Sequence, residues 1–421
     1  MKRRRCGLSY LFALILACSV VAPAGAQDVQ LLECACFPIV FVSGIGGFGE
    51  DDAINRIFPV WGMMGGSVAK YLNSQGYEAA TASVGPFSGS WDRACELYAH
   101  ITGTRTDYGA AHAAASGHSR YGPSYEKALV PGWNDTDRRV HLIGYSFGGT
   151  TVRMLAQLLR DGSPEERAAT PSGALSLLFS GTLGGRVASI TTLGAPHNGS
   201  TAFEPAVKKN VGALRTMMAG GAYLLNALPL DWFYSLRLGQ YGMSFLEFWL
   251  RPWEIANTCR FFTSTGVERA DLEMTIDGAA KLNEQLECLP DIYYFSYTAL
   301  MTEEDGQGNQ VPQKGMWTAF RGLAGDMGAR RAFTTPGGIF VDETWLPNDG
   351  QVNLVSARHP FDEPARAYDP EHMQSGVWQL MPTLEQDHFD FAGGVKHMFG
   401  GTPGTKEFYL GMAQMLEATQ N

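Results

Sequence analysis

The chain of 421 residues has no internal repeat, no low-complexity tract and no long linker. Long apolar runs are scarce as well, and the one around Leu11–Ala22 is too short for a convincing membrane span. Hydrophobic residues make up 45% and charged residues 18%, which is ordinary for a soluble enzyme with a large core. These absences favour a single globular domain.

Positive charge is also in short supply. The sequence has 32 Lys and Arg against 42 Asp and Glu, which gives a formal net charge of −10. A chain with this balance repels a phosphate backbone. We therefore expect no nucleic-acid partner.

The first 26 residues have the order of a secretory signal. Four basic residues, Lys2–Arg5, precede the apolar run, and Ala24-Gly25-Ala26 supplies the small residues of a cleavage site. This order predicts a signal peptide over 1–26, a mature chain from Gln27 and secretion. An alternative interpretation is lipid attachment at Cys18, because Leu14–Cys18 resembles a bacterial lipobox.

Cysteine is infrequent, and its pairing stays open. Two of the seven cysteines fall in the predicted signal peptide, and those that remain are Cys34, Cys36, Cys95, Cys259 and Cys288. Export permits disulfides, and a Cys259–Cys288 pair would bracket a loop-rich segment. Because five is an odd number, at least one thiol stays unpaired.

Buried strands alternate with helical segments along the chain. Residues 37–49 predict a strand that ends in a glycine-rich loop, and residues 67–77 predict a helix that Gly76 stops. Further buried strands are predicted at 139–146, 187–199 and 291–300. The alternation predicts an α/β fold with a mostly parallel central sheet and helices on both faces.

The segment Gly144-Tyr145-Ser146-Phe147-Gly148 carries the first chemical signal. An apolar strand precedes it and a helical pattern follows, which is the setting of a G-x-S-x-G nucleophile elbow in an α/β-hydrolase. An isolated match of this kind also fits a glycine turn whose serine caps the helix. The other members of a triad therefore decide between the two interpretations.

A serine nucleophile needs a histidine to take its proton and a carboxylate to orient that histidine. In this fold the chain order is serine, acid, histidine, and Asp349 and His388 follow Ser146 in that order. Asp349 also fits a plain Asn-Asp-Gly turn, and His388 also fits a surface position. Rival residues lie in the same region: the bases His372 and His397, and the acids Asp342 and Asp387.

Backbone N–H groups must donate hydrogen bonds to the substrate oxygen, because negative charge develops on it during the reaction. The amide of Phe147 follows the nucleophile, and the amide of Ile45 is best placed in the loop after the first strand. That glycine-rich loop also fits a phosphate cradle, but no lysine follows its glycines. We therefore expect an oxyanion hole formed by Ile45 and Phe147.

The sequence resembles the secreted, zinc-containing thermoalkalophilic bacterial lipases. The resemblance runs from about Pro38 to Gly393, and its most specific part is SVGPFSGSWDRACELYAHITGTRTDYGAAHAAASGHSRYG at 83–122. The segments ITTLGAPHNGST, LPNDGQVNLVS and GVWQLMPTLEQDHFDFAG support it. It implies the α/β-hydrolase fold, a helical lid, and the same nucleophile, acid, base and oxyanion amides as the residues themselves suggest.

The resemblance also implies a structural zinc ion in an insertion over about 86–125. Asp92, His112 and His118 match three ligands of the family, and two imidazoles with two carboxylates can close a tetrahedral zinc site. Counting back from Gly278 places the fourth ligand at Glu273, with Asp271 as the alternative.

The sequence departs from the family at several positions. Ser43 precedes Gly44 where the family has a histidine, and Phe147 replaces a polar residue, so the substrate range is in question. Asp390 keeps one carboxylate of the calcium site that many members have, but Val395 and Lys396 follow where another acid is needed. A hard cation needs several oxygens, so we expect calcium to bind weakly or not at all.

The sequence therefore predicts residues 27–421 as one secreted serine ester hydrolase, acting on acylglycerols at a lipid–water interface. The apolar, methionine-rich stretch over about 203–257 predicts the lid. A carboxylesterase for short soluble esters is the alternative within the enzyme class. A hydrolase fold without activity, used as a binding protein, is the alternative outside it.

Overall fold

The computed structural model describes residues 36–207, 230–242, 261, 268–394 and 402–420. All of them lie in one compact unit, Cys34–Asn421. Most of the predicted lid over 203–257, the rival base His397, and Val395 and Lys396 lie outside the described residues, as does the predicted signal peptide. No helix in the described ranges combines the length and apolar character that a membrane span requires.

A seven-stranded sheet forms the centre, in the order β12-β13-β7-β6-β5-β1-β2, and every neighbouring pair is parallel. Its strands are β1 (Ile39–Val42), β2 (Ala79–Ala82), β5 (Val140–Tyr145), β6 (Val187–Leu193), β7 (Tyr293–Tyr297), β12 (Ala365–Ala367) and β13 (Trp378–Leu380). The prediction of an α/β fold with a mostly parallel sheet is confirmed.

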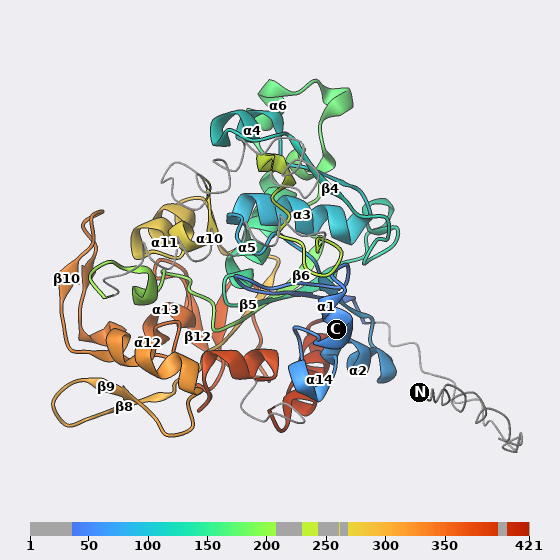
Figure 1. Cartoon of the computed structure of the whole chain (residues 1–421). Helices are drawn as coiled ribbons and strands as arrows, with labels where there is room; N and C mark the ends of the chain where they lie inside the picture. The colour runs from blue at the N-terminus through green and yellow to red at the C-terminus, as the bar shows by residue number, and fades with distance from the viewer. Residues whose placement is uncertain (1–35, 208–229, 243–260, 262–267, 395–401, 421) are drawn as a thin grey trace, which may run out of the picture. The chain divides into compact units, whose positions relative to one another are not determined.

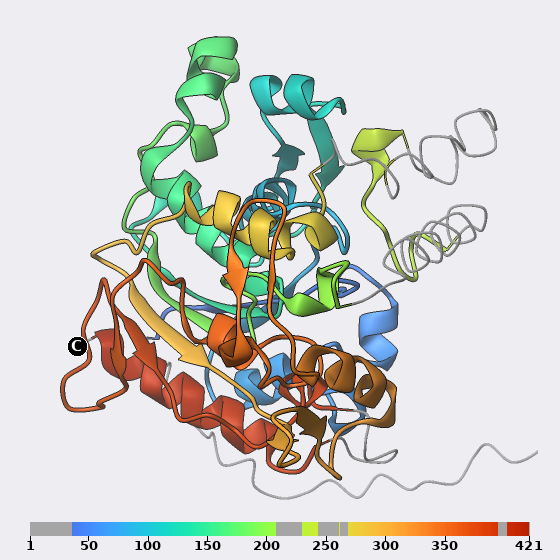
Figure 2. The same ribbon diagram turned by 90° about the vertical axis from the view of Figure 1, so that its left-hand side faces the viewer.

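Helices cover both faces of the sheet (Figures 1 and 2). The α-helices are α1 (Ile54–Ile57), α2 (Val68–Ser74), α3 (Ser90–Thr102), α4 (Ala110–Ser116), α5 (Gly148–Asp161), α6 (Pro164–Ala169), α10 (Ala270–Glu273), α11 (Ile276–Asn283), α12 (Thr318–Gly328), α13 (Leu354–Arg358) and α14 (Thr405–Glu417). Helices α3 and α5 lie on one face, and α2 and α14 lie on the other.

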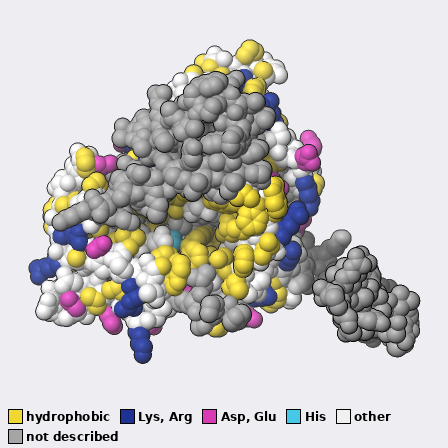
Figure 3. All heavy atoms as spheres, viewed as in Figure 1, with side chains coloured by type: hydrophobic (Ala, Val, Ile, Leu, Met, Phe, Trp, Pro, Cys, Tyr) yellow, Lys and Arg dark blue, Asp and Glu magenta, His cyan; other side chains and the backbone are white. Residues whose placement is uncertain are grey.

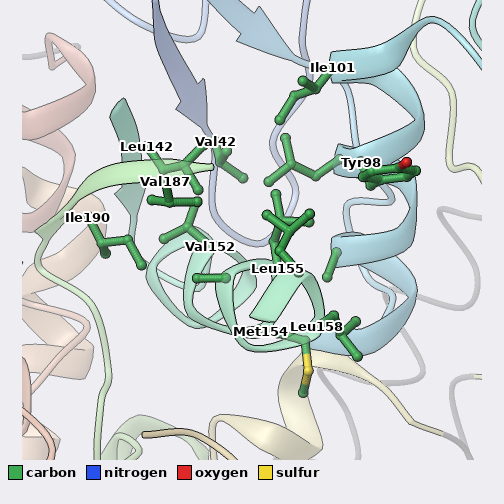
Figure 4. Close-up of a cluster of buried hydrophobic side chains, with 14 of the residues drawn as sticks. Val42, Tyr98, Ile101, Leu142, Val152, Met154, Leu155, Leu158, Val187 and Ile190 are labelled. Atoms are coloured by element: carbon green, nitrogen blue, oxygen red, sulfur yellow. The ribbon is translucent and has the colours of Figure 1, made fainter. Parts of the chain in front are cut away.

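Alternate strand residues supply the two cores. On β1, Val40 and Val42 face the α3–α5 side, whereas Ile39 and Phe41 face the α2–α14 side. Figure 4 shows the first core, in which Val42, Leu142 and Val187 of the sheet gather near Val152 of α5, with Tyr98 and Ile101 of α3 on the other side of the cluster. Because both faces are covered, every residue of β1, β5 and β6 is buried, and the four residues of β1 are all apolar.

Three small antiparallel sheets of two strands each lie outside the central sheet. They pair β3 (Arg105–Asp107) with β4 (Tyr121–Ser124), β8 (Thr302–Glu304) with β9 (Gln310–Pro312), and β10 (Phe333–Thr334) with β11 (Phe340–Val341). The β3–β4 pair, α3 and α4 lie between β2 and β5 in the chain, where the sequence predicts the zinc-site insertion over about 86–125.

The structure shows the bonding state of three cysteines. Cys36 is disulfide-bonded, whereas Cys95 and Cys288 carry free thiols. The Cys259–Cys288 pair that the spacing allows therefore does not form. Burial raises the pKa of the Cys288 thiol to about 12, which keeps it protonated.

Candidate active site and metal cluster

Ser146 occupies the sharp turn between β5 and α5, with a φ of 54°. Glycines make this turn possible, because a Cβ at Gly144 would lie 2.5 Å from the carbonyl oxygen of Gly148. A Cβ at Gly148 would in turn lie 2.2 Å from the carbonyl oxygen of Val42. The strand and the helix can thus approach closely, and the serine takes the strained conformation of a nucleophile elbow.

Asp349 and His388 are joined by two hydrogen bonds. The imidazole Nδ1 lies 2.8 Å from Asp349 Oδ2, and the His388 backbone N–H donates to the Asp349 carbonyl at 2.9 Å. Asp349 Oδ1 accepts from the backbone N–H groups of Gln351 and Val352, which fixes the carboxylate. Because the carboxylate accepts the Nδ1 proton, the other ring nitrogen, Nε2, is left to act as a base.

The His388 ring also lies close to the turn that holds Ser146. Its centroid is 4.9 Å from that of Tyr145, the residue before Ser146. Both His388 and Asp349 are buried. A Cβ at Gly194 would lie 3.2 Å from His388 Nδ1 and 3.3 Å from Asp349 Oδ2, so the end of β6 lies against this pair.

The described rival residues have other partners. Asp342 caps a short helix and accepts from Thr344, and Asp387 caps residues 388–392 and accepts from the N–H of Trp317. His372 is exposed and pairs with Asp369 at 2.9 Å. The structure therefore brings together the first-choice acid and base.

The loop after β1 lies directly over Ser146. A Cβ at Gly44 would lie 2.7 Å from Ser146 Cβ, so only glycine fits there. The side chain of Ile45 packs in the same apolar cluster as that of Phe147. Within the described residues, the backbone N–H groups of Ile45 and Phe147 form no hydrogen bond with the protein.

Asp92, His112 and His118 form a second cluster on α3, on α4 and just after α4. One ligand atom from each lies within 4.8 Å of the others. His112 Nε2 is 3.0 Å from Asp92 Oδ1, and His118 Nε2 is 3.5 Å from the same oxygen. Burial alone would raise the pKa of Asp92, but hydrogen bonding with His112 and the closeness of His118 outweigh it and lower the pKa.

The donor set of this cluster suits a metal ion. His118 Nδ1 lies 2.9 Å from the Ser119 carbonyl oxygen, which can only accept, so Nδ1 carries the proton and Nε2 keeps a lone pair. That Nε2 atom is buried and makes no hydrogen bond among the described residues. Buried polar atoms are rarely left unsatisfied, and a metal ion would satisfy this one.

The carboxylates that the sequence suggests as a fourth ligand have other partners. Both oxygens of Glu273 accept from the backbone N–H of Ser90, at 3.1 and 2.9 Å, and Asp271 pairs with Arg269. Glu268 instead brings Oε2 to 3.9 Å from His112 Nε2. The prediction from the sequence does not reach Glu268, because it assumes the family's fixed spacing between the fourth ligand and Gly278.

Asp390 has partners on both carboxylate oxygens. Oδ2 accepts from the N–H of Asp387 in a capping box, and Oδ1 accepts from the Thr402 hydroxyl at 2.8 Å. The candidate calcium ligand thus caps the short helix that carries His388.

Several large apolar side chains are exposed. Figure 3 shows apolar side chains gathered on one face of the molecule. Large exposed apolar residues on and beside α1 are Ile57, Phe58 and Met64, and the carbonyl of the exposed Trp232 accepts from the N–H of Ala53 just before α1. We call these four residues the apolar patch.

Known proteins resemble this chain along most of its length. Residues 35–420 match the family model described as "Lipase-like, C-terminal domain". Lipase 2 of Staphylococcus aureus is 36% identical over 386 residues, which is 89% of this chain and 52% of that protein. The chain therefore spans about half the length of the curated relatives it matches.

Solved structures resemble the chain over nearly their whole lengths. The Staphylococcus hyicus lipase has a TM-score of 0.78 at 30% identity, covering 91% of this chain and 96% of that one. EstA from Clostridium botulinum has a TM-score of 0.74 at 32% identity, covering 93% and 89%.

Proposed function

This chain belongs to the lipase-like C-terminal domain family, and on that premise we propose that it is a secreted serine ester hydrolase acting on acylglycerols. The observation that carries the proposal is the hydrogen-bonded Asp349–His388 pair, which lies against the turn that holds Ser146. Ser146 is the proposed nucleophile, His388 the base and Asp349 the residue that orients the base.

In the first half of the reaction, Ser146 Oγ attacks the ester carbonyl carbon while His388 Nε2 takes the hydroxyl proton. The N–H groups of Ile45 and Phe147 donate to the oxyanion of the tetrahedral intermediate. The carbon–oxygen bond to the alcohol then breaks, and His388 gives its proton to the leaving alkoxide. The products are an acyl-serine and a free alcohol.

In the second half, a water molecule attacks the acyl-serine and His388 takes its proton. The same two amides donate to the second oxyanion. The bond between the acyl carbon and Ser146 Oγ then breaks, and His388 returns the proton to Oγ. A fatty acid is released and the site is restored. Asp349 stays ionised throughout and stabilises the imidazolium in both halves.

The apolar patch supports an acylglycerol substrate at a lipid–water interface. Exposed Ile, Phe and Met side chains on and beside α1, and the exposed Trp232, favour contact with lipid. A carboxylesterase for short soluble esters is the second candidate, because the same triad would hydrolyse either kind of ester.

Rates on p-nitrophenyl esters from butyrate to stearate, with a Ser146→Ala control, separate the two candidates. A lipase keeps turnover on long chains, and its rate on tributyrin rises when the substrate forms an emulsion. An esterase loses activity with chain length and saturates below the solubility limit. An inactive binding protein would hydrolyse none of these esters.

We also propose that Asp92, His112 and His118 hold a structural zinc ion, with a carboxylate as the fourth ligand. Glu268 is the preferred fourth ligand, ahead of Glu273 and Asp271, because it alone of the three approaches a histidine of the cluster. Four protein ligands would leave no open position, so the metal would brace the fold and take no part in the chemistry.

Variants of the three carboxylates test the fourth ligand. We expect Glu268→Gln to weaken zinc binding by at least about 10-fold, whereas Glu273→Gln and Asp271→Asn keep it near that of the unmodified protein. Zinc competition with a chromogenic chelator measures the affinity. If Glu273→Gln alone weakens binding, Glu273 is the ligand.

Two smaller proposals follow the sequence. Residues 1–26 direct export, with lipid attachment at Cys18 as the alternative. Calcium has little effect on this chain, because Asp390 has protein partners on both oxygens. Isolation of the mature protein and activity with and without a calcium chelator test these statements.

A further inference from the structure

Arg93 is a fully buried arginine in the first turn of α3, next to Asp92. Its guanidinium donates in three directions. Nε donates to the Thr151 hydroxyl at 2.8 Å, Nη1 donates to the Gly85 carbonyl at 2.7 Å, and Nη2 donates to the Ser43 carbonyl.

Two of these acceptors belong to the two halves of the proposed oxyanion hole. Ser43 lies two residues before Ile45, in the loop over the nucleophile. Thr151 lies in the first turn of α5, and its hydroxyl donates to the Phe147 carbonyl at 3.3 Å. The guanidinium carbon also lies 5.3 Å from the centre of the Phe147 ring. One rigid planar group thus spans both halves.

The hydrogen-bond partners of Arg93 differ from those of two other buried arginines. Two other buried arginines pair with carboxylates: Arg153 with Glu363 at 3.0 Å and Arg237 with Asp52 at 3.1 Å. Among the described residues, Arg93 forms no such ion pair, and its acceptors are two carbonyls and one hydroxyl. Glu96 and Glu273 act on the guanidinium electrostatically, so the contribution of Arg93 lies in the backbone that it holds.

We propose that Arg93 is a positioning residue of the oxyanion hole, which fixes the Ile45 loop against the Phe147 turn. This inference rests on the proposed function, because it acts on the same reaction. Arg93 does not touch the substrate; it acts through the backbone that it holds.

The test compares Arg93→Met with Arg93→Lys, measured as kcat per active site after titration with a fluorophosphonate. We expect Arg93→Met to lower kcat by about 10- to 100-fold with KM nearly unchanged, less than the loss of about 100- to 1,000-fold when an oxyanion donor itself is removed. Arg93→Lys keeps a hydrogen-bond donor at the end of a long side chain and should recover part of the loss. Affinity for an alkyl boronic acid, whose serine adduct mimics the oxyanion, should fall in parallel with kcat.

Arg153→Met is the matched control, because it removes another buried arginine whose partners are Glu363 and Asn283. It should lower thermal stability while kcat per titrated site and boronic-acid affinity stay unchanged. If Arg93→Met does not fold, Thr151→Val removes one acceptor of Arg93, and we expect it to lower kcat and boronic-acid affinity together.

The outcomes separate this inference from the proposed function. If the unmodified protein neither reacts with the fluorophosphonate nor hydrolyses esters, the proposed function fails. If it does both, and Arg93→Met or Thr151→Val has unchanged kcat per site and boronic-acid affinity, only the role of Arg93 is overturned. A fall in stability and active fraction alone would also assign Arg93 a purely structural role.

Discussion

At the scale of single residues, backbone strain marks the proposed nucleophile. Among the described residues, Ser146 is one of three non-glycine residues with positive φ, together with Met63 and Arg237. Such a conformation costs of order 1–3 kcal/mol and persists only where the surroundings enforce it. Gly44 and Gly148 allow it here, because a Cβ at either position would collide with its neighbours.

Removal of either member of the proton-transfer pair should abolish most hydrolysis. We expect Ser146→Ala and His388→Ala each to lower kcat by on the order of 10⁶, and the double variant to lose hardly more than either alone. The reason is that serine and histidine act as one unit. Circular dichroism confirms folding, and kcat on a soluble ester measures the loss.

His372→Ala is the control for this series, since the His372 ring is exposed and pairs with Asp369. If His372→Ala or His397→Ala abolishes turnover while His388→Ala keeps it, the base is misassigned. Additive losses in the double variant would mean that Ser146 and His388 do not act together.

The residues of the proposed triad can be selected from the sequence, because a strand, a G-x-S-x-G turn and a helix are local patterns. Glu268 and Arg93 cannot be selected in this way. The approach of Glu268 to His112 depends on where the chain returns after a long insertion, and spacing does not encode that path. The position of Arg93 beside Asp92 is a weak signal, since burial and hydrogen-bond partners appear only in the fold.

At the scale of elements, the segment 230–242 links the two candidate sites. Tyr234 donates to the Gly46 carbonyl in the loop over Ser146, and Arg237 pairs with Asp52 just beyond that loop. Asp52 Oδ2 also accepts from the N–H of Gly49. At the other end, the Gln240 side chain donates to Asp92 at 3.2 Å.

The Arg237–Asp52 pair should contribute strongly to stability, because both side chains are buried. We expect Arg237→Met to lower the free energy of unfolding by about 3–5 kcal/mol, since it leaves the Asp52 carboxylate buried without its partner. Arg138→Met, which breaks a half-exposed pair with Glu78, should cost less than about 1 kcal/mol. Urea unfolding measures both, and equal losses would contradict the assignment.

Metal removal should act on the fold before it acts on the chemistry. Chelation is expected to lower the melting temperature, because a metal held by Asp92, His112 and His118 would link α3 to α4 and to the loop after α4. At a temperature well below the new transition, kcat per active site should stay near its original value. Immediate loss of kcat without a change in melting temperature would place the metal in the reaction.

The elements themselves were largely accessible from the sequence. The predicted helix over 67–77 is α2, Val68–Ser74, and Gly76 follows it with a φ of 92°. The predicted strand over 291–300 is shorter, Tyr293–Tyr297, because Ala299 leaves the ladder for a single bridge with Leu384. Strands β12 and β13 have three residues each, and such short segments carry too little periodicity to be recognised.

At the scale of the whole molecule, buried histidines set the response to acid. His100, His141 and His197 are each about 1% exposed. Burial lowers the pKa of His100 and His141 to about 3 and lowers that of His197 well below its usual value. In the folded protein they stay neutral where the unfolded chain takes up protons.

Stability should therefore fall as the pH falls from about 6.5 towards about 3, because the unfolded state binds more protons in this window. Each such histidine adds a slope of about 1.4 kcal/mol per pH unit. His141→Gln should lower the slope of unfolding free energy against pH by the contribution of one histidine, as measured by urea unfolding at several pH values. An unchanged slope would mean that His141 is already charged in the folded protein.

The central claim is that Ser146, activated by His388 and Asp349, is the nucleophile of an ester hydrolase. Its most direct test is labelling with a fluorophosphonate, followed by mass mapping of the labelled peptide and assay of the remaining ester hydrolysis. The account predicts one probe per chain, on Ser146, with hydrolysis falling in proportion to labelling and no label on Ser146→Ala. Full hydrolysis in protein labelled at Ser146, or a label on another residue that abolishes hydrolysis, would contradict it.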